Sequence, residues 1–131
     1  MIVVDASVLA NVVADDGPEG DRIRGLVVDA GPAAIPDIAD VETMAVLRKR
    51  WIAKRVTERR LEAAVTDLAA FPAERYPARP LLDRVYELRS NVTPYDAVYV
   101  ALAEALGYDL LTADARLARA TGPRCTIRVV T

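Results

Sequence analysis

The chain has 131 residues and a formal net charge of −2, and 53% of its residues are hydrophobic. This size and composition predict one compact domain over residues 1–131, with a core that needs neither disulfides nor a structural metal. Histidine is absent and Cys125 is the one cysteine, which excludes Ser-His-Asp and Cys-His catalysis, an internal disulfide and the usual zinc sites. Any strong metal site must therefore use oxygen ligands, which suit Mg²⁺, Mn²⁺ or Ca²⁺.

Nothing in the hydropathy pattern indicates a membrane segment. No apolar run reaches the ~20 residues that span a bilayer, and the N-terminal MIVVD has no basic segment of the kind that opens a signal peptide. A single thiol fits a reducing compartment. We therefore expect a soluble protein of the cytoplasm.

Strands and helices are expected to alternate along the first half of the chain. The β-branched run over 2–4 predicts a buried strand, followed by a helix over 7–14 that the turn sequence DDGP ends. A second helix is expected over 19–30 and a second strand over 33–35. Asp40 is the expected N-cap of a helix over 41–52, and Thr57 that of a helix ending near residue 69.

The second half continues the alternation after a stretch that is hard to assign. Residues 71–80 contain three prolines, and we expect only a weak strand near 75–77, then a helix over 81–89. Thr93 and Pro94 predict the start of a deeply packed helix that Gly107 ends. A strand over 109–112, a short helix over 115–120 and a strand over 126–130 complete the prediction.

This alternation predicts an α/β fold of three layers, an α/β/α sandwich with a mostly parallel central sheet. Such sheets carry functional residues beyond the carboxyl ends of their strands, where the strand order reverses. Asp5 follows the first strand, and Thr112 with Asp114 follows a later one. We expect these residues to emerge at the same edge of the sheet.

Four acids stand at strand ends or helix starts, and each also has a purely structural explanation. Asp5 and Asp114 fit helix N-caps, and Asp96 with Thr93 comes close to a capping box. Glu42 lies in a first helical turn, where the helix dipole stabilises an acid by roughly 0.3–1 kcal/mol. Four such acids together favour a shared metal site over four independent caps.

The remaining polar candidates are assigned to structure or left open. We assign five acids to turns, caps or a strand start: Asp15, Asp16, Asp37, Asp40 and Asp109. Ser7 fits either a helix cap or a residue that positions a phosphate or a metal-bound water.

Basic residues concentrate between residues 48 and 60, although the chain as a whole is slightly acidic. This basic stripe consists of Arg48, Lys49, Arg50, Lys54, Arg55, Arg59 and Arg60. It fits a surface that meets phosphates or an acidic partner, and equally a solvated helix face.

Four segments, taken in order, resemble the PIN domain, and more narrowly the compact VapC toxins of bacterial toxin–antitoxin pairs. They are VVDASVLANV at 3–12, PDIADVETMAVL at 36–47, TPYDAVYVALAEALG at 93–107 and LLTAD at 110–114. The resemblance implies an α/β/α sandwich, usually dimeric, that cleaves RNA and binds a small antitoxin. The family's acidic quartet then corresponds to Asp5, Glu42, Asp96 and Asp114, with its frequent hydroxyl at Thr112.

The expected activity is hydrolysis of RNA phosphodiester bonds with one or two Mg²⁺ or Mn²⁺ ions. We expect Asp5, Asp96 and Asp114 to be the main metal ligands. Glu42 is expected to orient the attacking water or complete the metal shell, and Thr112 to help hold the metal or a phosphate. A homodimer, or a dimer of toxin–antitoxin heterodimers, is the expected assembly.

Two other kinds of function fit the sequence less well than a nuclease does. A metal-dependent phosphatase or phosphotransfer domain also has an acid after its first strand, but Ser7 stands where such phosphatases need a second acid. Receiver domains need a late lysine, and the lysines here are Lys49 and Lys54. A non-catalytic module that binds RNA or protein through the basic stripe does not need the four acids.

Overall fold

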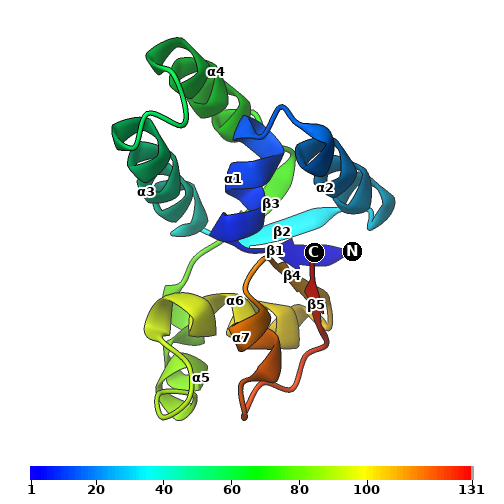
Figure 1. The fold of residues 1–131 in the computed structure, drawn as a ribbon. Helices are drawn as coiled ribbons and strands as arrows, with labels where there is room; N and C mark the ends of the chain where they lie inside the picture. Colours follow the sequence, from blue (N-terminus) through cyan, green and yellow to red (C-terminus); the bar gives the residue numbers. More distant parts are fainter. Residues whose placement is uncertain (131) are drawn as a thin grey trace.

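A parallel sheet runs through the middle of the molecule in the computed structural model, which describes residues 1–130 (Figure 1). Its strands lie in the order β3-β2-β1-β4-β5, and each neighbouring pair is parallel. The strands are β1 (Ile2–Val4), β2 (Ala33–Pro36), β3 (Ala73–Tyr76), β4 (Asp109–Thr112) and β5 (Ile127–Val129).

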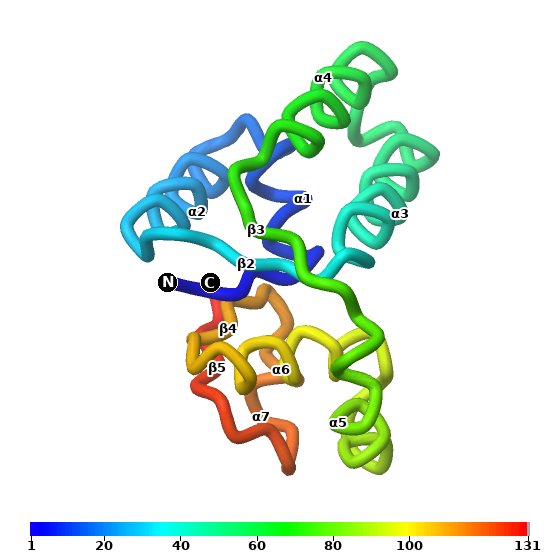
Figure 2. The backbone as a smooth tube through the Cα atoms, turned by 180° about the vertical axis from the view of Figure 1, so that it is seen from behind, coloured from blue at the N-terminus to red at the C-terminus, as the bar shows by residue number. Residues whose placement is uncertain are grey.

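Helices cover both faces of this sheet, so the predicted three-layer α/β/α architecture is confirmed (Figures 1 and 2). One layer contains α1 (Ala6–Ala14), α2 (Pro18–Asp29), α3 (Ala39–Ile52) and α4 (Glu58–Ala69). The other contains the 3₁₀ turn η1 (Arg79–Leu81), α5 (Leu82–Glu87), α6 (Pro94–Leu106) and α7 (Ala115–Arg119). Within residues 1–130, no helix combines the length and the hydropathy that a bilayer crossing requires.

The core is densest where β1 lies between α1 and α6. All three residues of β1 are fully buried, and every residue of α6 from 97 to 103 is buried as well. A parallel strand covered on both faces needs apolar side chains throughout, which explains the unbroken Ile2–Val4 run. The first polar residue after this strand, Asp5, can therefore appear only at its carboxyl end.

The strand order reverses between β1 and β4. The chain builds β1, β2 and β3 toward one side, and then returns to add β4 and β5 on the other side. Parallel sheets open a crevice at such a point, beyond the carboxyl ends of the two strands. The amide of Asp5 donates to the carbonyl of Leu111 at 3.1 Å, which holds Asp5 beside the end of β4.

Several predicted helix ends are confirmed by their hydrogen bonds. The hydroxyl of Thr57 accepts from the Arg60 amide at 3.1 Å, and that of Thr93 accepts from the Asp96 amide at 3.3 Å. Gly107 ends α6 in the left-handed conformation, with φ of 70°, which an L side chain adopts only at a cost.

Asp40 is not the N-cap that the sequence pattern suggested. Helix α3 begins at Ala39, two residues before the expected start at residue 41, because Ile38 already has helical backbone angles. Asp40 lies in the first turn, and its carboxylate binds the guanidinium of Arg75 on β3 at 2.7 and 3.0 Å. Two parallel charge-assisted bonds outweigh what a single cap would contribute.

The boundaries around the proline-rich stretch also differ from the expected ones. The weak strand expected at 75–77 lies at Ala73–Tyr76, because pairing with β2 sets its register, with Ala33 opposite Ala73 and Pro36 opposite Tyr76. The helix expected over 81–89 is regular only over Leu82–Glu87. A 3₁₀ turn that contains Pro80 precedes it.

Two glycines of α2 provide a matched test of how this helix packs on the end of α1. A Cβ at Gly20 would lie 2.0 Å from the carbonyl oxygen of Asp15, whereas a Cβ at Gly25 would meet nothing within 4 Å. Gly20→Ala should therefore lower the free energy of unfolding by about 1–3 kcal/mol. Gly25→Ala should raise it by about 0.5–1 kcal/mol, because alanine favours the helix.

Urea unfolding of both variants beside the unmodified protein measures this difference. Equal stabilisation by the two substitutions would contradict the close approach of α2 to the end of α1.

Candidate active site

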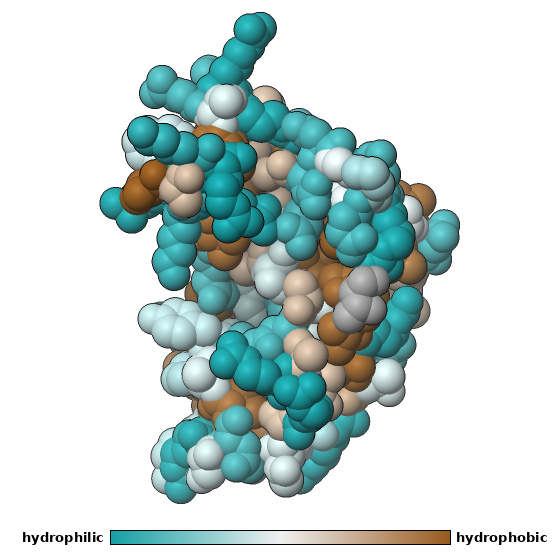
Figure 3. Space-filling view, viewed as in Figure 1, coloured by the Kyte–Doolittle hydropathy of each residue, from teal (hydrophilic) through white to brown (hydrophobic). Residues whose placement is uncertain are grey.

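Four carboxylates border the edge of the sheet at which β1 and β4 end. Asp5 directly follows β1, and Asp114 comes two residues after β4. Glu42 and Asp96 lie in the first turns of α3 and α6, one from each helical layer. The space-filling view shows a hollow between the two layers (Figure 3).

Asp5 is the most buried of these acids, with 5% of its surface exposed. It is the N-cap of α1, because its Oδ1 accepts from the Val8 amide at 3.2 Å and from the Ser7 hydroxyl at 2.5 Å. Burial raises the pKa of this carboxyl, against the opposing effect of hydrogen bonds from Ser7, Thr112 and Val8. The charge of Asp96 raises it further. Asp5 is therefore both a helix cap and a carboxylate in an unfavourable electrostatic position.

Glu42 is partly buried and is tied to the opposite helical layer. The hydroxyl of Tyr99, a residue of α6 with 1% of its surface exposed, donates to Glu42 Oε1 at 2.7 Å. Burial raises the pKa of Glu42, the Tyr99 hydrogen bond lowers it, and the charges of Asp96 and Asp5 raise it again. Glu42 thus belongs to the same electrostatic group as Asp5 and Asp96.

Asp96 and Asp114 line one cavity of about 260 Å³, together with Asn91, Thr93 and Arg116. Burial raises the pKa of Asp96, and the charge of Asp114 adds to this effect. The pKa of Asp114 is lowered, first by the Arg116 amide, which donates to its Oδ1 at 2.9 Å, and also by the Arg116 guanidinium. The two carboxyls of this cavity therefore shift in opposite directions.

Half of the suspected capping box is present at the start of α6. Thr93 accepts from the Asp96 amide, but within residues 1–130 the Asp96 carboxylate accepts no hydrogen bond from the Thr93 amide in return. The cap is therefore made by Thr93, and the carboxylate of Asp96 lines the cavity, where the Thr93 hydroxyl lowers its pKa against the larger effect of burial.

Two hydroxyls connect the acids through the backbone. Ser7 donates to Asp5 and accepts from the Ala113 amide at 3.1 Å, which joins α1 to the loop after β4. Thr112 Oγ1 accepts from the Asp114 amide at 3.0 Å. Thr112 is fully buried, which favours a role in positioning Asp114 over direct contact with a phosphate.

The expected single pocket is present only in part. Asp96 and Asp114 share a cavity that Asp5 and Glu42 do not line. Within residues 1–130, no three carboxylate or thiolate side chains lie close enough together to bind one metal ion. The donor set itself is carboxylate and hydroxyl oxygen, the chemistry that Mg²⁺ and Mn²⁺ prefer. The four acids are linked through their charges rather than gathered around one point.

Two residues of this site were missed by the sequence analysis. Tyr99 was not singled out, although it follows Asp96 by three residues and therefore lies on the same face of α6. Arg116 was not considered, although it follows the cap residue Asp114 by two positions. Spacing relative to a candidate acid was the available signal in both cases.

Fold and site together define a doubly wound α/β/α domain whose carboxylates lie at the switch point of its sheet. The PIN domain family model matches residues 2–123. The chain is 40% identical to ribonuclease VapC1 of Mycobacterium tuberculosis over 98% of this chain and 96% of that protein, and 35% identical to VapC12 over 99% of each. The chain belongs to the PIN-domain family and, within it, to the VapC group.

Solved structures of low sequence identity share the fold. VapBC2 from Rickettsia felis, solved bound to a DNA fragment from its promoter, matches with a TM-score of 0.70 and 14% identity over the whole of both chains. VapC20 of Mycobacterium tuberculosis, described as a toxin that cleaves the sarcin–ricin loop, matches with a TM-score of 0.65 and 17% identity over 84% of this chain and 87% of that one.

The opposite pKa shifts of Asp96 and Asp114 predict opposite effects of amide substitution in the presence of EDTA. A raised pKa means that ionised Asp96 destabilises the folded state at pH 7, and that this effect disappears as pH falls through its folded pKa. Asp96→Asn should therefore raise the melting temperature at pH 7. Asp114 has a lowered pKa and contributes stability above its unfolded pKa, so Asp114→Asn should lower the melting temperature at pH 7.

Melting curves at pH 7 and near pH 3, which lies below the ordinary aspartate pKa of about 3.9, check both signs. Asparagine retains the capping ability of aspartate, so Asp114→Asn isolates the loss of charge. A lower melting temperature for Asp96→Asn at pH 7 would contradict the electrostatic description of the cavity.

Proposed function

We propose that this chain is an endoribonuclease dependent on Mg²⁺ or Mn²⁺, and the toxin of a toxin–antitoxin pair. The observation that carries the proposal is the placement of Asp5, Glu42, Asp96 and Asp114 around the switch point of the sheet, at strand ends and at helix starts from both helical layers. Relatives named as VapC ribonucleases support the RNA substrate. Membership of this family argues against the phosphotransfer alternative.

The proposed ligands of one or two ions are Asp5, Asp96 and Asp114, with Glu42 either completing the shell or orienting the attacking water. Without cations, clustered carboxylates repel both one another and an RNA phosphate. A bound Mg²⁺ or Mn²⁺ ion would neutralise them, polarise the phosphodiester and acidify water.

Each surrounding residue has a definite task in this proposal. Ser7 and the Val8 amide hold Asp5 Oδ1, so the orientation of the carboxylate is set before substrate arrives. Tyr99 holds Glu42 Oε1, which leaves Oε2 to accept a proton from the attacking water. Thr112 fixes the amide of Asp114 and hence the turn that presents its carboxylate.

We further propose a small antitoxin as partner and a homodimer as the basic assembly. The solved relatives include DNA-bound VapBC complexes from Rickettsia felis and Salmonella typhimurium, which supports both a protein partner and assembly of the pair on its promoter. Large apolar side chains exposed on α3, α5 and α6 provide surface for such contacts: Val41, Trp51, Ile52, Leu82, Tyr86 and Tyr95.

The test of metal dependence is incubation with total RNA in Mg²⁺ and mapping of the cut ends. EDTA should stop cleavage and Mn²⁺ should restore it. Asp96→Asn should lower the rate by on the order of 100-fold or more, because it removes a proposed ligand charge. Asp67→Asn on α4 is the matched control and should cleave normally. Undiminished cleavage in EDTA would rule out the metal requirement.

Tyr99→Phe tests the task of Glu42. The Tyr99 hydroxyl stabilises the ionised carboxylate, so its removal should raise the pKa of Glu42 and move the acidic limb of the pH–rate profile to higher pH. Tyr95→Phe, at an exposed tyrosine of the same helix, should leave the profile unchanged. An unshifted profile for Tyr99→Phe would exclude Glu42 as the proton acceptor.

A further inference from the structure

Three arginines of the basic stripe, Arg50, Arg55 and Arg60, line the largest cavity described in this molecule. None of the four site carboxylates lines this cavity. This cavity of about 630 Å³ lies where the end of α1 meets the connection between α3 and α4. Its lining residues are Asn11, Ala14, Asp15, Asp16, Arg50, Arg55, Val56, Thr57 and Arg60. Hydrophilic side chains cover much of this end of the molecule (Figure 3).

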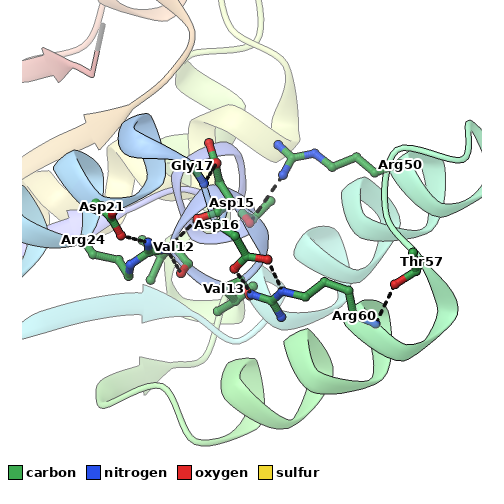
Figure 4. Close-up of polar contacts among 11 residues, drawn as sticks. Val12, Val13, Asp15, Asp16, Gly17, Asp21, Arg24, Arg50, Thr57 and Arg60 are labelled. Atoms are coloured by element: carbon green, nitrogen blue, oxygen red, sulfur yellow. Dashed lines mark hydrogen bonds and ion pairs between the residues drawn. The ribbon is translucent and has the colours of Figure 1, made fainter.

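The arginines of this cavity differ in what they bind. Arg60 is already paired, because its guanidinium donates to both carboxylate oxygens of Asp16 at 2.7 and 2.9 Å and to the carbonyl of Val13 at 2.8 Å. Figure 4 shows Arg60 and Arg50 reaching from α4 and α3 toward the end of α1. The Arg60 contacts tie α4 to α1 and leave little capacity for a ligand.

Arg50 is a partly buried cation whose partners are all neutral. Its guanidinium donates to Asn11 Oδ1 at 2.7 Å and to the Ala10 carbonyl at 3.5 Å. Within residues 1–130 it forms no ion pair. Burial lowers its pKa, and the neighbouring charge of Arg55 lowers it further against the opposing effect of Asp15. A cation in this position is destabilised unless an anion joins it.

Arg55 and the start of α4 complete the same wall of the cavity. Arg55 is exposed, and its side chain makes no hydrogen bond or ion pair within the described chain. Helix α4 begins at Glu58 behind its cap Thr57, so the positive end of the helix dipole faces this region. Arg50, Arg55 and the N-terminal end of α4 thus line the same cavity.

The cavity lies at the far ends of two helices that start beside the carboxylates. Asp5 is the N-cap of α1, whose last residue Ala14 lines the cavity, and α3 has Glu42 in its first turn and Arg50 near its end. Eight residues separate Glu42 from Arg50, which corresponds to about 12 Å along the helix at ~1.5 Å per residue. A single RNA strand can cover this distance with a few nucleotides.

We propose that Arg50 and Arg55 bind a backbone phosphate of the RNA strand that is cut at the carboxylates, a few nucleotides from the scissile bond. This inference rests on the proposed ribonuclease function. The site is concave and Asp16 is already neutralised by Arg60, so an isolated phosphate group fits beside Arg50 and Arg55 better than a broad acidic protein surface does. Phosphate contacts of this kind position a strand without reading its bases.

The experiment measures binding of a single-stranded RNA, long enough to reach both places, in EDTA. Arg50→Gln removes the positive charge and retains a hydrogen-bond donor for Asn11. Arg55→Gln also removes a positive charge, and it breaks no hydrogen bond or ion pair of the described chain. The double variant should bind about tenfold more weakly, and the slope of log K against log salt should become shallower by about 0.7 for each phosphate that the protein no longer neutralises. Arg128→Gln on β5 loses one positive charge, as each of the two single variants does, and is the control for those variants; it should bind as the unmodified protein does.

Cleavage separates this inference from the function it rests on. If the unmodified protein cuts RNA but the double variant binds with the same affinity and salt slope, the phosphate site is wrong and the ribonuclease stands. If the unmodified protein neither binds nor cuts RNA, the ribonuclease itself is wrong. A variant that keeps its RNA affinity but loses binding to a poly-glutamate peptide would overturn the assignment in favour of an acidic protein. If Arg50→Gln fails to fold, the RNA affinity and salt slope of Arg55→Gln alone test the phosphate site.

Discussion

Burial of β1 on both of its faces is the constraint that shapes everything at the carboxyl edge of this sheet. A strand enclosed by α1 and α6 has no room for polarity, so its first acid, Asp5, appears where the strand stops. The same enclosure withdraws Asp5 from water and raises its pKa. Neighbouring acids then act on one another through a medium that screens charge poorly. The core thus creates an electrostatic problem that the proposed divalent cation would solve.

Most of the helices and strands could be predicted from the sequence because several independent signals indicated them. Unbroken apolar strands, hydroxyl caps at Thr57 and Thr93, and the glycine at 107 each indicated an element without help from the rest of the chain. Where local signals were weak, pairing decided the outcome. β3 owes its position to β2, and the partnership of Asp40 with Arg75 depends on a contact between residues 35 positions apart.

For the candidate site, the sequence predicted four acids near one edge of the sheet but not the contacts that hold them. Strand ends and helix starts pointed to Asp5, Glu42, Asp96 and Asp114 before any geometry was known. The supporting contacts of Tyr99 and Ser7 could not be derived, because each joins segments that only the tertiary fold brings together. Nor could the composition of the basic stripe distinguish Arg60, neutralised by Asp16, from Arg50, which has no acidic partner.

The bond from Ala113 to Ser7 spans 106 positions of the chain, and β1 lies between β2 and β4. During translation, the central strand therefore lacks one of its two neighbours until β4, at Asp109–Thr112, has been made. Contacts of such long range form late and slowly. A nascent chain that has not reached β4 consequently carries Asp5 and Glu42 without the arrangement that joins the acids, so any nuclease activity is delayed until β4 has been made and has paired.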